Sequence, residues 1–342
     1  MKAIAKTEAA PGVALIDAPE PETERGTVKI KLEAASVCGT DLHIYSWDPW
    51  AASRIEPPRI IGHEFCGTVV EVGEGVDDRK AGDFVASESH IVCGRCRQCK
   101  LGQGHVCVNT RILGVDVDGG FAEYAVIPAA NARPTDRSIP PHIAAFQDAL
   151  GNAVHTVMAG PVEGQAILIT GMGPIGIFSA QICKLLGASL VVGTEVSPFR
   201  IALARRSGVE HVFDPTAGQL EAALCKLAPA GFDGVLEMSG HPDALALAVR
   251  CVRPGGRISL LGLFSDSVQN VRMDDLIFKG VQVQGIVGRR LWETWDQMNW
   301  LLQEKKLDVS SVVTDTMHFT EFAKAMELMK AGQAGKVVFR FD

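Results

Sequence analysis

The chain has 342 residues, of which 47% are hydrophobic and 21% charged, and its formal net charge is −7. This length suggests two domains at roughly 100–200 residues each, and the composition is that of ordinary globular proteins. The negative charge argues against a nucleic-acid partner, because binding a phosphate backbone needs clustered Lys and Arg. The sequence contains no apolar run of about 18 residues, so we expect no membrane-spanning helix and no membrane partner.

The N-terminal segment, residues 1–20, has no apolar stretch followed by a small-residue cleavage site. We therefore expect no signal peptide and a cytoplasmic location. The nine cysteines are not spaced as a disulfide framework, which agrees with a reducing compartment.

The first 90 residues show short strand patterns separated by Gly and Pro. Residues 28–32 alternate apolar and polar side chains, as in a half-buried strand. Segments 62–75 and 82–85 continue this glycine-punctuated style. An irregular all-β or mixed first domain is the fold this pattern predicts.

Residues 36–67 carry the first group of chemically active side chains. Cys38, His63 and Glu64 offer a thiolate, an imidazole and a carboxylate, which are ligand types that Zn²⁺ takes. Three protein ligands with one open position define a catalytic zinc site. Thr40 and His43 would share a face of a helical turn and could pass a proton from an alcohol to solvent. The alternative for each residue alone is a small core cysteine and a hydrogen-bonded histidine.

Four further cysteines follow in the pattern C-x2-C-x2-C-x7-C, at Cys93, Cys96, Cys99 and Cys107. Four thiolates on one loop can close a tetrahedral zinc site, which would be structural because no position stays open. An iron–sulfur cluster is the competing interpretation, since its ligands also occur in C-x2-C-x2-C runs. The sequence favours zinc because no Pro follows a fourth closely spaced Cys and no second cluster set is present.

From about residue 148 the pattern changes to alternating strands and helices. Residues 166–170 form an apolar run typical of a strand buried on both faces. The run leads into a G-x-G-x-x-G turn (Gly171, Gly173 and Gly176), then a helical pattern and a second apolar run, residues 190–194. In this context the turn predicts a dinucleotide site whose pyrophosphate lies at the helix N-terminus.

Glu195 ends the second strand, 19 residues after Gly176. A carboxylate at this point can bind ribose hydroxyls and repels a 2′-phosphate, which favours NAD over NADP. Arg200 leaves the choice open, because an Arg nearby is what a 2′-phosphate would need. Its alternative role is a solvated helix residue that packs its stem near the adenine.

Residues 232–237, 256–261 and 281–285 read as later parallel strands, whose C-terminal loops would line the cofactor crevice. A last strand is predicted near residues 336–339. The predicted domains are therefore a zinc domain, residues 1–147 completed by 295–342, and a dinucleotide domain, residues 148–294.

The sequence resembles the zinc-dependent medium-chain dehydrogenase/reductase family over its whole length. Both zinc motifs and the glycine turn occur in the family's order, and segments 38–47, 151–156, 237–240 and 288–295 match one subfamily more closely. The resemblance implies an α/β fold: a GroES-like irregular β catalytic domain plus a Rossmann domain with a doubly wound parallel sheet. It also implies a homotetramer.

The resemblance assigns roles to individual residues. It implies a catalytic zinc on Cys38, His63 and Glu64, a structural zinc on the four later cysteines, and a Thr40–His43 proton relay. Asp148 takes the place of an acid that is often the longer Glu, so we expect a relay role or support from outside the ligand shell, with zinc ligation in some states as the alternative. The implied cofactor residues are Gly171, Gly173, Ile175, Gly176, Glu195, Arg200, Gly262, Leu263, Phe264, Ile286 and Val287.

The implied reaction is oxidation of the 3-hydroxyl of L-threonine to 2-amino-3-oxobutanoate, with reduction of NAD. A zwitterionic substrate needs partners for its carboxylate and ammonium groups, and His90 is our candidate, with Asn152, Arg289 and Arg290 as others. The first rival is a zinc-dependent polyol or secondary-alcohol dehydrogenase, because a fold does not fix a substrate. The second rival is a non-catalytic zinc- and dinucleotide-binding protein.

Overall fold

The computed structural model describes residues 1–341 and divides them into two compact units. Unit 1 holds residues 1–149, 290–295 and those from 313 onward, and unit 2 holds residues 150–289 and 296–312. The sequence assigned three segments differently: it placed residues 148–149 and 290–294 with the dinucleotide domain and residues 296–312 with the zinc domain. Among residues 1–341, no helix combines the length and the apolar character needed to cross a bilayer.

Unit 1 is built mainly from short strands. Its seven-stranded sheet has the order β10-β6-β5-β3-β18-β17, with β9 paired to β3, and the strands β2-β1-β4 and β7-β8 form two smaller sheets. The bounds are β1 (Lys2–Lys6), β2 (Ala14–Asp17), β3 (Thr27–Ser36), β4 (Arg59–Ile60), β5 (Glu64–Val72), β6 (Phe84–Ser87), β7 (His90–Ile91), β8 (Arg111–Ile112), β9 (Tyr124–Pro128), β10 (Ala132–Pro134), β17 (Val313–His318) and β18 (Lys336–Arg340).

Helices, most of them short, connect these strands. Their bounds are α1 (Gly39–Ser46), α2 (Pro49–Arg54), α3 (Arg97–Lys100), α4 (Pro141–Ala144) and α12 (Phe322–Lys330), while α5 (Gln147–Met158) and α11 (Glu293–Gln303) run across the unit boundaries. The irregular β domain expected from the sequence is confirmed.

The core of unit 1 forms where β3, β5 and β18 meet. Phe65, Phe121 and Phe339 are fully buried there, and the rings of Phe121 and Phe339 meet edge to face with centroids 5.2 Å apart. The predicted strand at residues 28–32 lies within β3, but Lys29 is only 9% exposed. Its ammonium pairs with Glu20 and lies over the Tyr124 ring. Strand alternation alone predicts that Lys29 is exposed, whereas these contacts allow it to be buried.

Unit 2 is a six-stranded parallel sheet with the order β13-β12-β11-β14-β15-β16. Counted along the chain this is 3-2-1-4-5-6, the doubly wound dinucleotide-binding order. The strands are β11 (Ala166–Thr170), β12 (Leu190–Thr194), β13 (His211–Phe213), β14 (Phe232–Glu237), β15 (Val252–Leu260) and β16 (Gln282–Gly285). The Rossmann sheet predicted from the sequence is confirmed.

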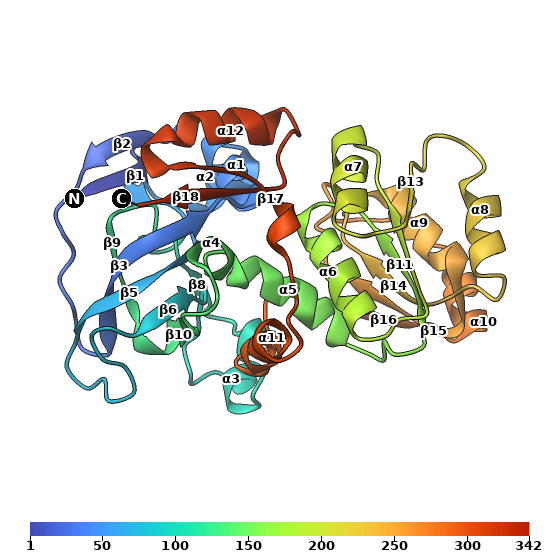
Figure 1. The fold of residues 1–342 in the computed structure, drawn as a ribbon, viewed down its shortest axis with the longest axis horizontal. Coiled ribbons are helices and arrows are strands. Elements are labelled where there is room, and N and C mark those ends of the chain that lie inside the picture. Colours follow the sequence, from blue (N-terminus) through green and yellow to red (C-terminus); the bar gives the residue numbers. More distant parts are fainter. Residues whose placement is uncertain (342) are drawn as a thin grey trace. The chain divides into compact units, whose positions relative to one another are not determined.

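The helices of unit 2 cover both faces of this sheet. They are α6 (Pro174–Leu185), α7 (Pro198–Arg206), α8 (Leu220–Leu227), α9 (Pro242–Cys251) and α10 (Met273–Lys279). Figure 1 shows α6 and α7 on one face and α9 and α10 on the other. Both faces of β11 are therefore covered, which is why Ile167, Leu168 and Ile169 are all fully buried.

Candidate metal centres and dinucleotide site

Cys38, His63 and Glu64 come together in unit 1. One donor atom from each lies within 4.8 Å of the others, although Cys38 is 25 residues from His63 in sequence. Cys38 is the N-cap of α1, His63 immediately precedes β5, and Glu64 is the first residue of β5. Sulfur, nitrogen and oxygen donors converging in this way match the donor set of a zinc site with three protein ligands.

Sheet register explains how Glu64 is held. Ser36 of β3 lies opposite Glu64 of β5, and β18 pairs with the other edge of β3. The Ser36 hydroxyl donates a hydrogen bond to Glu64 Oε2, and Lys336 Nζ lies 2.5 Å from the same oxygen. Burial alone would raise the pKa of Glu64, but the Lys336 ammonium lowers it. Glu64 is therefore held as a carboxylate, the form that binds a metal.

Asp41 contacts two members of the same donor group, Cys38 and His63. Its Oδ2 accepts a hydrogen bond from the Cys38 N–H at 2.8 Å, and its Oδ1 lies 3.9 Å from His63 Nδ1. Burial raises the pKa of Asp41 to about 6. Burial by itself would lower the pKa of His63, but Cys38, Asp41 and Glu64 raise it to about 10. The concentration of negative charge thus favours a cation among these donors, as zinc binding requires.

Gly62 sets the direction in which His63 enters the group. Its φ is +90°, and a Cβ built on it would lie 2.2 Å from Cδ1 of the Phe121 ring. Its carbonyl accepts the N–H of Gly120. No side chain other than hydrogen fits here, so the sharp turn before His63 depends on this glycine.

Both predicted relay residues lie on α1, as the three-residue spacing indicated. Thr40 Oγ1 is 3.8 Å from Cys38 Sγ. The His43 side chain is 60% exposed, and its Nδ1 lies 2.5 Å from Oδ2 of Asp48. The chain therefore provides a hydroxyl beside the candidate metal ligands and an imidazole that reaches solvent. The sequence did not lead us to Asp48.

Asp148 and His90 are linked to one buried segment. Asp148 is buried near the start of α5, and its Oδ1 accepts the N–H of Ser89 at 2.9 Å. The donor group of Cys38, His63 and Glu64 does not include it. The N–H of His90 is bound by Oε1 of Glu88 at 2.9 Å, and Oε2 of Glu88 accepts Nε1–H of Trp295 at 2.7 Å.

Glu88 and Trp295 are both fully buried. The amide of Asn131 adds hydrogen bonds to the carbonyls of Glu88 and His90, at 2.7 and 3.0 Å. Residues 88–90 are thus fixed by side chains that are distant in sequence. Sequence reasoning did not identify Glu88, because a single Glu between strand residues has no distinguishing pattern.

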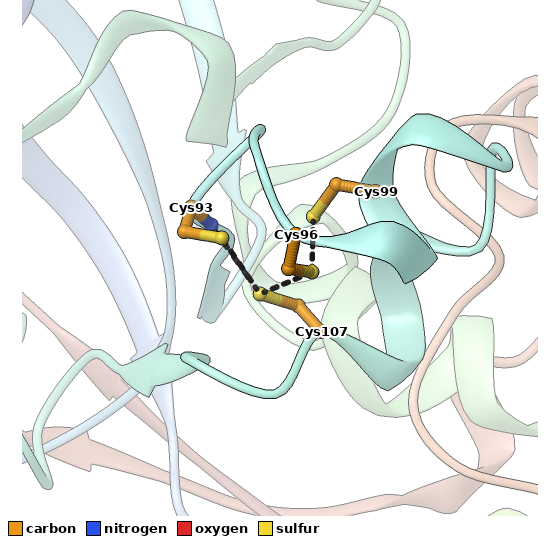
Figure 2. Close-up of side chains that lie close together, drawn as sticks. All are labelled: Cys93, Cys96, Cys99 and Cys107. Carbon is orange, nitrogen blue, oxygen red and sulfur yellow. Dashed lines mark hydrogen bonds between the residues drawn. The ribbon is translucent and has the colours of Figure 1, made fainter.

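The four clustered cysteines form the second candidate metal centre (Figure 2). Their sulfur atoms lie 3.5 Å apart for Cys96 and Cys99, 3.8 Å for Cys96 and Cys107, and 3.5 Å for Cys93 and Cys107. Sulfurs bound at about 2.3 Å to one tetrahedral ion would lie about 3.8 Å apart. These separations are also too long for disulfide bonds, so the arrangement fits one ion held by four thiolates.

Hydrogen bonds prepare this cluster for metal. The side chain of Asn109, with backbone N–H groups of Arg95 and Cys96, lowers the pKa of Cys93 to about 5. Desolvation and the neighbouring sulfurs raise the pKa of Cys99 to about 12. Four adjacent thiolates repel one another, so the cluster would need a bound cation, and Zn²⁺ is one that such a ligand set suits.

The glycine turn of unit 2 uses its three glycines differently. A Cβ on Gly176 would lie 2.1 Å from the carbonyl oxygen of Gly171, so close packing of α6 requires glycine there. Gly171 has φ +87° and makes the tight turn. Gly173, the N-cap of α6, would point a Cβ into open space. That open space at a helix N-terminus fits a pyrophosphate group.

Glu195 binds the turn to the neighbouring strand loop. Its carboxylate accepts the N–H groups of Met172, Val196 and Ser197 at 2.9–3.0 Å. Arg200 Nη1 lies 4.0 Å from Glu195 Oε2. A cavity of about 820 Å³ within unit 2 is lined by Gly171, Gly173, Glu195 and Arg200, together with Met238 and Ser239. Four predicted cofactor residues thus share one cavity of a size suited to a ligand.

The other predicted cofactor residues lie elsewhere at the carboxyl edge of the sheet or inside α6. Ile175 and Gly176 belong to the first turn of α6, whereas Gly262, Leu263 and Phe264 follow β15, and Ile286 and Val287 follow β16. Leu263 is 94% exposed. The cavity lining does not include these residues, and their contact with a cofactor stays a prediction.

Glu237 precedes the cavity-lining residues Met238 and Ser239, and sequence reasoning used it only as the end of a strand and as part of the subfamily-matching segment 237–240. It ends β14, and its Oε1 accepts hydrogen bonds from the N–H groups of Ser239 and Gly240 and from the Ser239 hydroxyl. Like Glu195, it uses a carboxylate to shape a loop after a strand. Glu195 and Glu237 each stand at the end of an apolar run, and this shared position is the signal that could have identified both residues.

The remaining candidates for substrate binding have partners of their own. Arg289 is buried and donates from Nη1 to Oδ1 of Asn152 at 3.2 Å. Arg290 Nη1 lies 3.8 Å from Glu293. These contacts leave the choice of substrate residues a prediction.

Comparison with known proteins agrees with this geometry. Residues 24–137 match the family Alcohol dehydrogenase GroES-like domain, and residues 174–304 match the family Zinc-binding dehydrogenase. The chain therefore belongs to the zinc-dependent medium-chain dehydrogenase/reductase family, as the sequence resemblance predicted.

Two similar proteins carry the same name. A protein of Pyrococcus abyssi named L-threonine 3-dehydrogenase is 48% identical over 99% of this chain and 98% of its own length. The L-threonine 3-dehydrogenase of Thermococcus kodakarensis is also 48% identical, over 99% of this chain and 97% of its own. The solved structure of an E. coli CFT073 protein, described as a short chain alcohol dehydrogenase (rspB) with NADH, superposes with a TM-score of 0.91 at 28% identity, covering 100% of this chain and 99% of the other.

Proposed function

We propose that this chain oxidises the 3-hydroxyl of L-threonine to 2-amino-3-oxobutanoate and reduces NAD to NADH. The observation that carries the proposal is the full-length similarity to relatives named L-threonine 3-dehydrogenase. The converging donors Cys38, His63 and Glu64 support it, because zinc-assisted alcohol oxidation needs such a set.

Bound zinc would polarise the substrate hydroxyl and lower its pKa, and bound NAD would accept the hydride. The chain supplies the proton path. Thr40, beside Cys38, accepts the hydroxyl proton, and His43, 60% exposed, passes it to solvent. Asp148, which accepts the N–H of Ser89, is proposed to support this relay from outside the ligand shell, and His90 is the proposed partner for a charged group of the substrate.

NAD is the proposed cofactor rather than NADP. The Glu195 carboxylate would repel a 2′-phosphate, and Arg200 lies 4.0 Å from that carboxylate, so part of its charge is already balanced. Glu195→Gln should raise KM for NAD and lower the preference for NAD over NADP, measured as the ratio of the two kcat/KM values. An unchanged preference would argue against this assignment.

We propose that the four clustered cysteines hold one structural zinc, which gives two zinc ions per subunit. Ser in place of Cys107 should reduce the zinc content by one ion per chain and lower the thermal stability. Loss of iron rather than zinc would favour the cluster alternative.

We further propose a cytoplasmic homotetramer. Unit 2 carries exposed apolar side chains on α10 and the edge strand β16: Ile277 is 66%, Phe278 87% and Val283 47% exposed. An open strand edge with apolar neighbours is a surface that a second copy would cover. Phe278→Glu should lower the mass measured by light scattering, while an unchanged mass would place the interface elsewhere.

A polyol or secondary-alcohol dehydrogenase is the main alternative, because the same zinc chemistry would serve it. Initial rates of NADH formation should be measured with L-threonine, D-threonine, sorbitol and 2,3-butanediol, before and after zinc chelation. We expect the highest kcat/KM for L-threonine, with activity lost on chelation and restored by zinc. Preference for a polyol would overturn the substrate, and absence of turnover with every alcohol would favour the non-catalytic alternative.

A further inference from the structure

His43 and Asp48 face each other across the junction of α1 and α2. Trp47 ends α1 with φ +53°, a left-handed conformation that turns the chain back on itself. Asp48 follows as the N-cap of α2, and its Oδ1 accepts the N–H of Ala51 at 2.9 Å. Its other oxygen, Oδ2, lies 2.5 Å from His43 Nδ1. One carboxylate thus serves a helix end with one oxygen and an imidazole with the other.

This contact determines which ring nitrogen of neutral His43 carries the proton. The N–H of Ala51 and the contact with His43 hold the pKa of Asp48 below its ordinary value, so Asp48 is ionised at neutral pH. An ionised carboxylate only accepts hydrogen bonds. His43 Nδ1 must therefore be the donor, which leaves the lone pair on Nε2.

We propose that Asp48 is a positioning residue that fixes neutral His43 in the Nδ1–H tautomer, so that Nε2 is the nitrogen that receives the proton arriving from Thr40. When Nε2 takes this proton, His43 becomes an imidazolium next to the Asp48 carboxylate, and loss of that proton from Nε2 to solvent restores the starting state. The tautomer assignment stands on the contact alone, whereas its effect on rate rests on the proposed function.

The two roles of Asp48 can be separated by one substitution. Asn is as good an N-cap as Asp, so Asp48→Asn can keep the hydrogen bond to Ala51. Its amide would however donate to His43 Nδ1, which moves the ring proton to Nε2 and blocks acceptance there. In serine proteases the equivalent Asp→Asn change leaves the geometry intact and lowers kcat about 10⁴-fold through the wrong tautomer. Because His43 is open to water, we expect a smaller loss here, of about 10- to 100-fold.

Kinetics test this consequence. With Asp48→Asn, kcat should fall while KM for L-threonine and for NAD stays within about twofold, because an interaction made only during reaction is lost. His43→Gln should cost at least as much, and adding Asp48→Asn to it should cost nothing further, since both act through one proton path. Trp50→Phe is the matched control: the Trp50 ring centroid lies 6.1 Å from that of His43, but it contributes no hydrogen bond to Nδ1, so kcat should stay unchanged. Additive losses in the double variant would overturn the proposal.

NMR of the zinc-loaded enzyme labelled with ¹³C,¹⁵N-histidine reads the tautomer directly, with the His43 signals assigned by their disappearance in His43→Gln. We expect Nδ1–H in the wild type and in Trp50→Phe, and Nε2–H in Asp48→Asn. Nε2–H in the wild type would overturn the proposal even if the enzyme is active. Nδ1–H in a protein that does not oxidise L-threonine would uphold the positioning role and refute the proposed function.

Discussion

Gly62 offers the sharpest test of how the fold places the metal ligands. Gly62→Ala adds one methyl group at φ +90°, and that methyl group would lie 2.2 Å from the Phe121 ring. The ring is fully buried against Phe339 and has little room to move. An L-residue in a left-handed conformation costs about 1–2 kcal/mol, and overpacking a core adds about 1–3 kcal/mol. We therefore expect a loss of about 2–5 kcal/mol in unfolding free energy.

Gly82 provides the matched control. Its φ is +94°, close to that of Gly62, but a Cβ there would meet nothing within 4 Å. Gly82→Ala should therefore cost only the backbone term, about 1–2 kcal/mol. Urea unfolding of both zinc-loaded variants gives the comparison, and zinc analysis should show loss at the Cys38 site only for Gly62→Ala, because His63 follows the altered residue. Equal destabilisation of the two variants would refute the reasoning.

Two other changes have defined outcomes. Trp295→Phe removes the hydrogen bond to the buried Glu88 carboxylate, which should lower the unfolding free energy by about 1.5–3 kcal/mol; Trp300→Phe on the same helix is the control, and equal losses would contradict the role of Glu88. Arg54 binds Asp116 through two hydrogen bonds and, although burial opposes it, lowers the pKa of that carboxyl. Stability from the pair is present above the ordinary Asp pKa of about 3.9 and is lost as pH falls through the lower folded value. Urea unfolding should therefore show Arg54→Met less stable than the wild type by about 0.5–1 kcal/mol at pH 7, with the difference shrinking as the pH falls below about 3.9. A difference that does not shrink at low pH would count against an ionic origin.

The sequence predicted the parts of the fold whose pattern is local. Residues 166–170 and 190–194 are strands with the predicted bounds, because a strand buried on both faces leaves a continuous apolar run. The four-cysteine metal site was equally predictable, because all four donors lie within one loop. In each case the residues that decide the structure are close together in the chain.

What the sequence could not predict depends on pairing between distant segments. Lys336 meets Glu64 only because β18 and β5 flank β3 in one sheet, 272 residues apart in sequence. Glu88 meets Trp295 across 207 residues. Asp48 is near His43 in sequence, yet their contact depends on the left-handed turn at Trp47, a conformation that a non-glycine residue seldom signals.

The central claim is that the hydride leaves C3 of L-threonine and reaches the nicotinamide. The most direct test supplies the zinc-loaded enzyme with NAD and L-threonine carrying deuterium either at C3 or at C2, followed by mass spectrometry of the reduced cofactor. The account predicts one deuterium in the reduced cofactor from the C3-labelled substrate and none from the C2-labelled one. Transfer of the C2 label, or no cofactor reduction with either substrate, would contradict it.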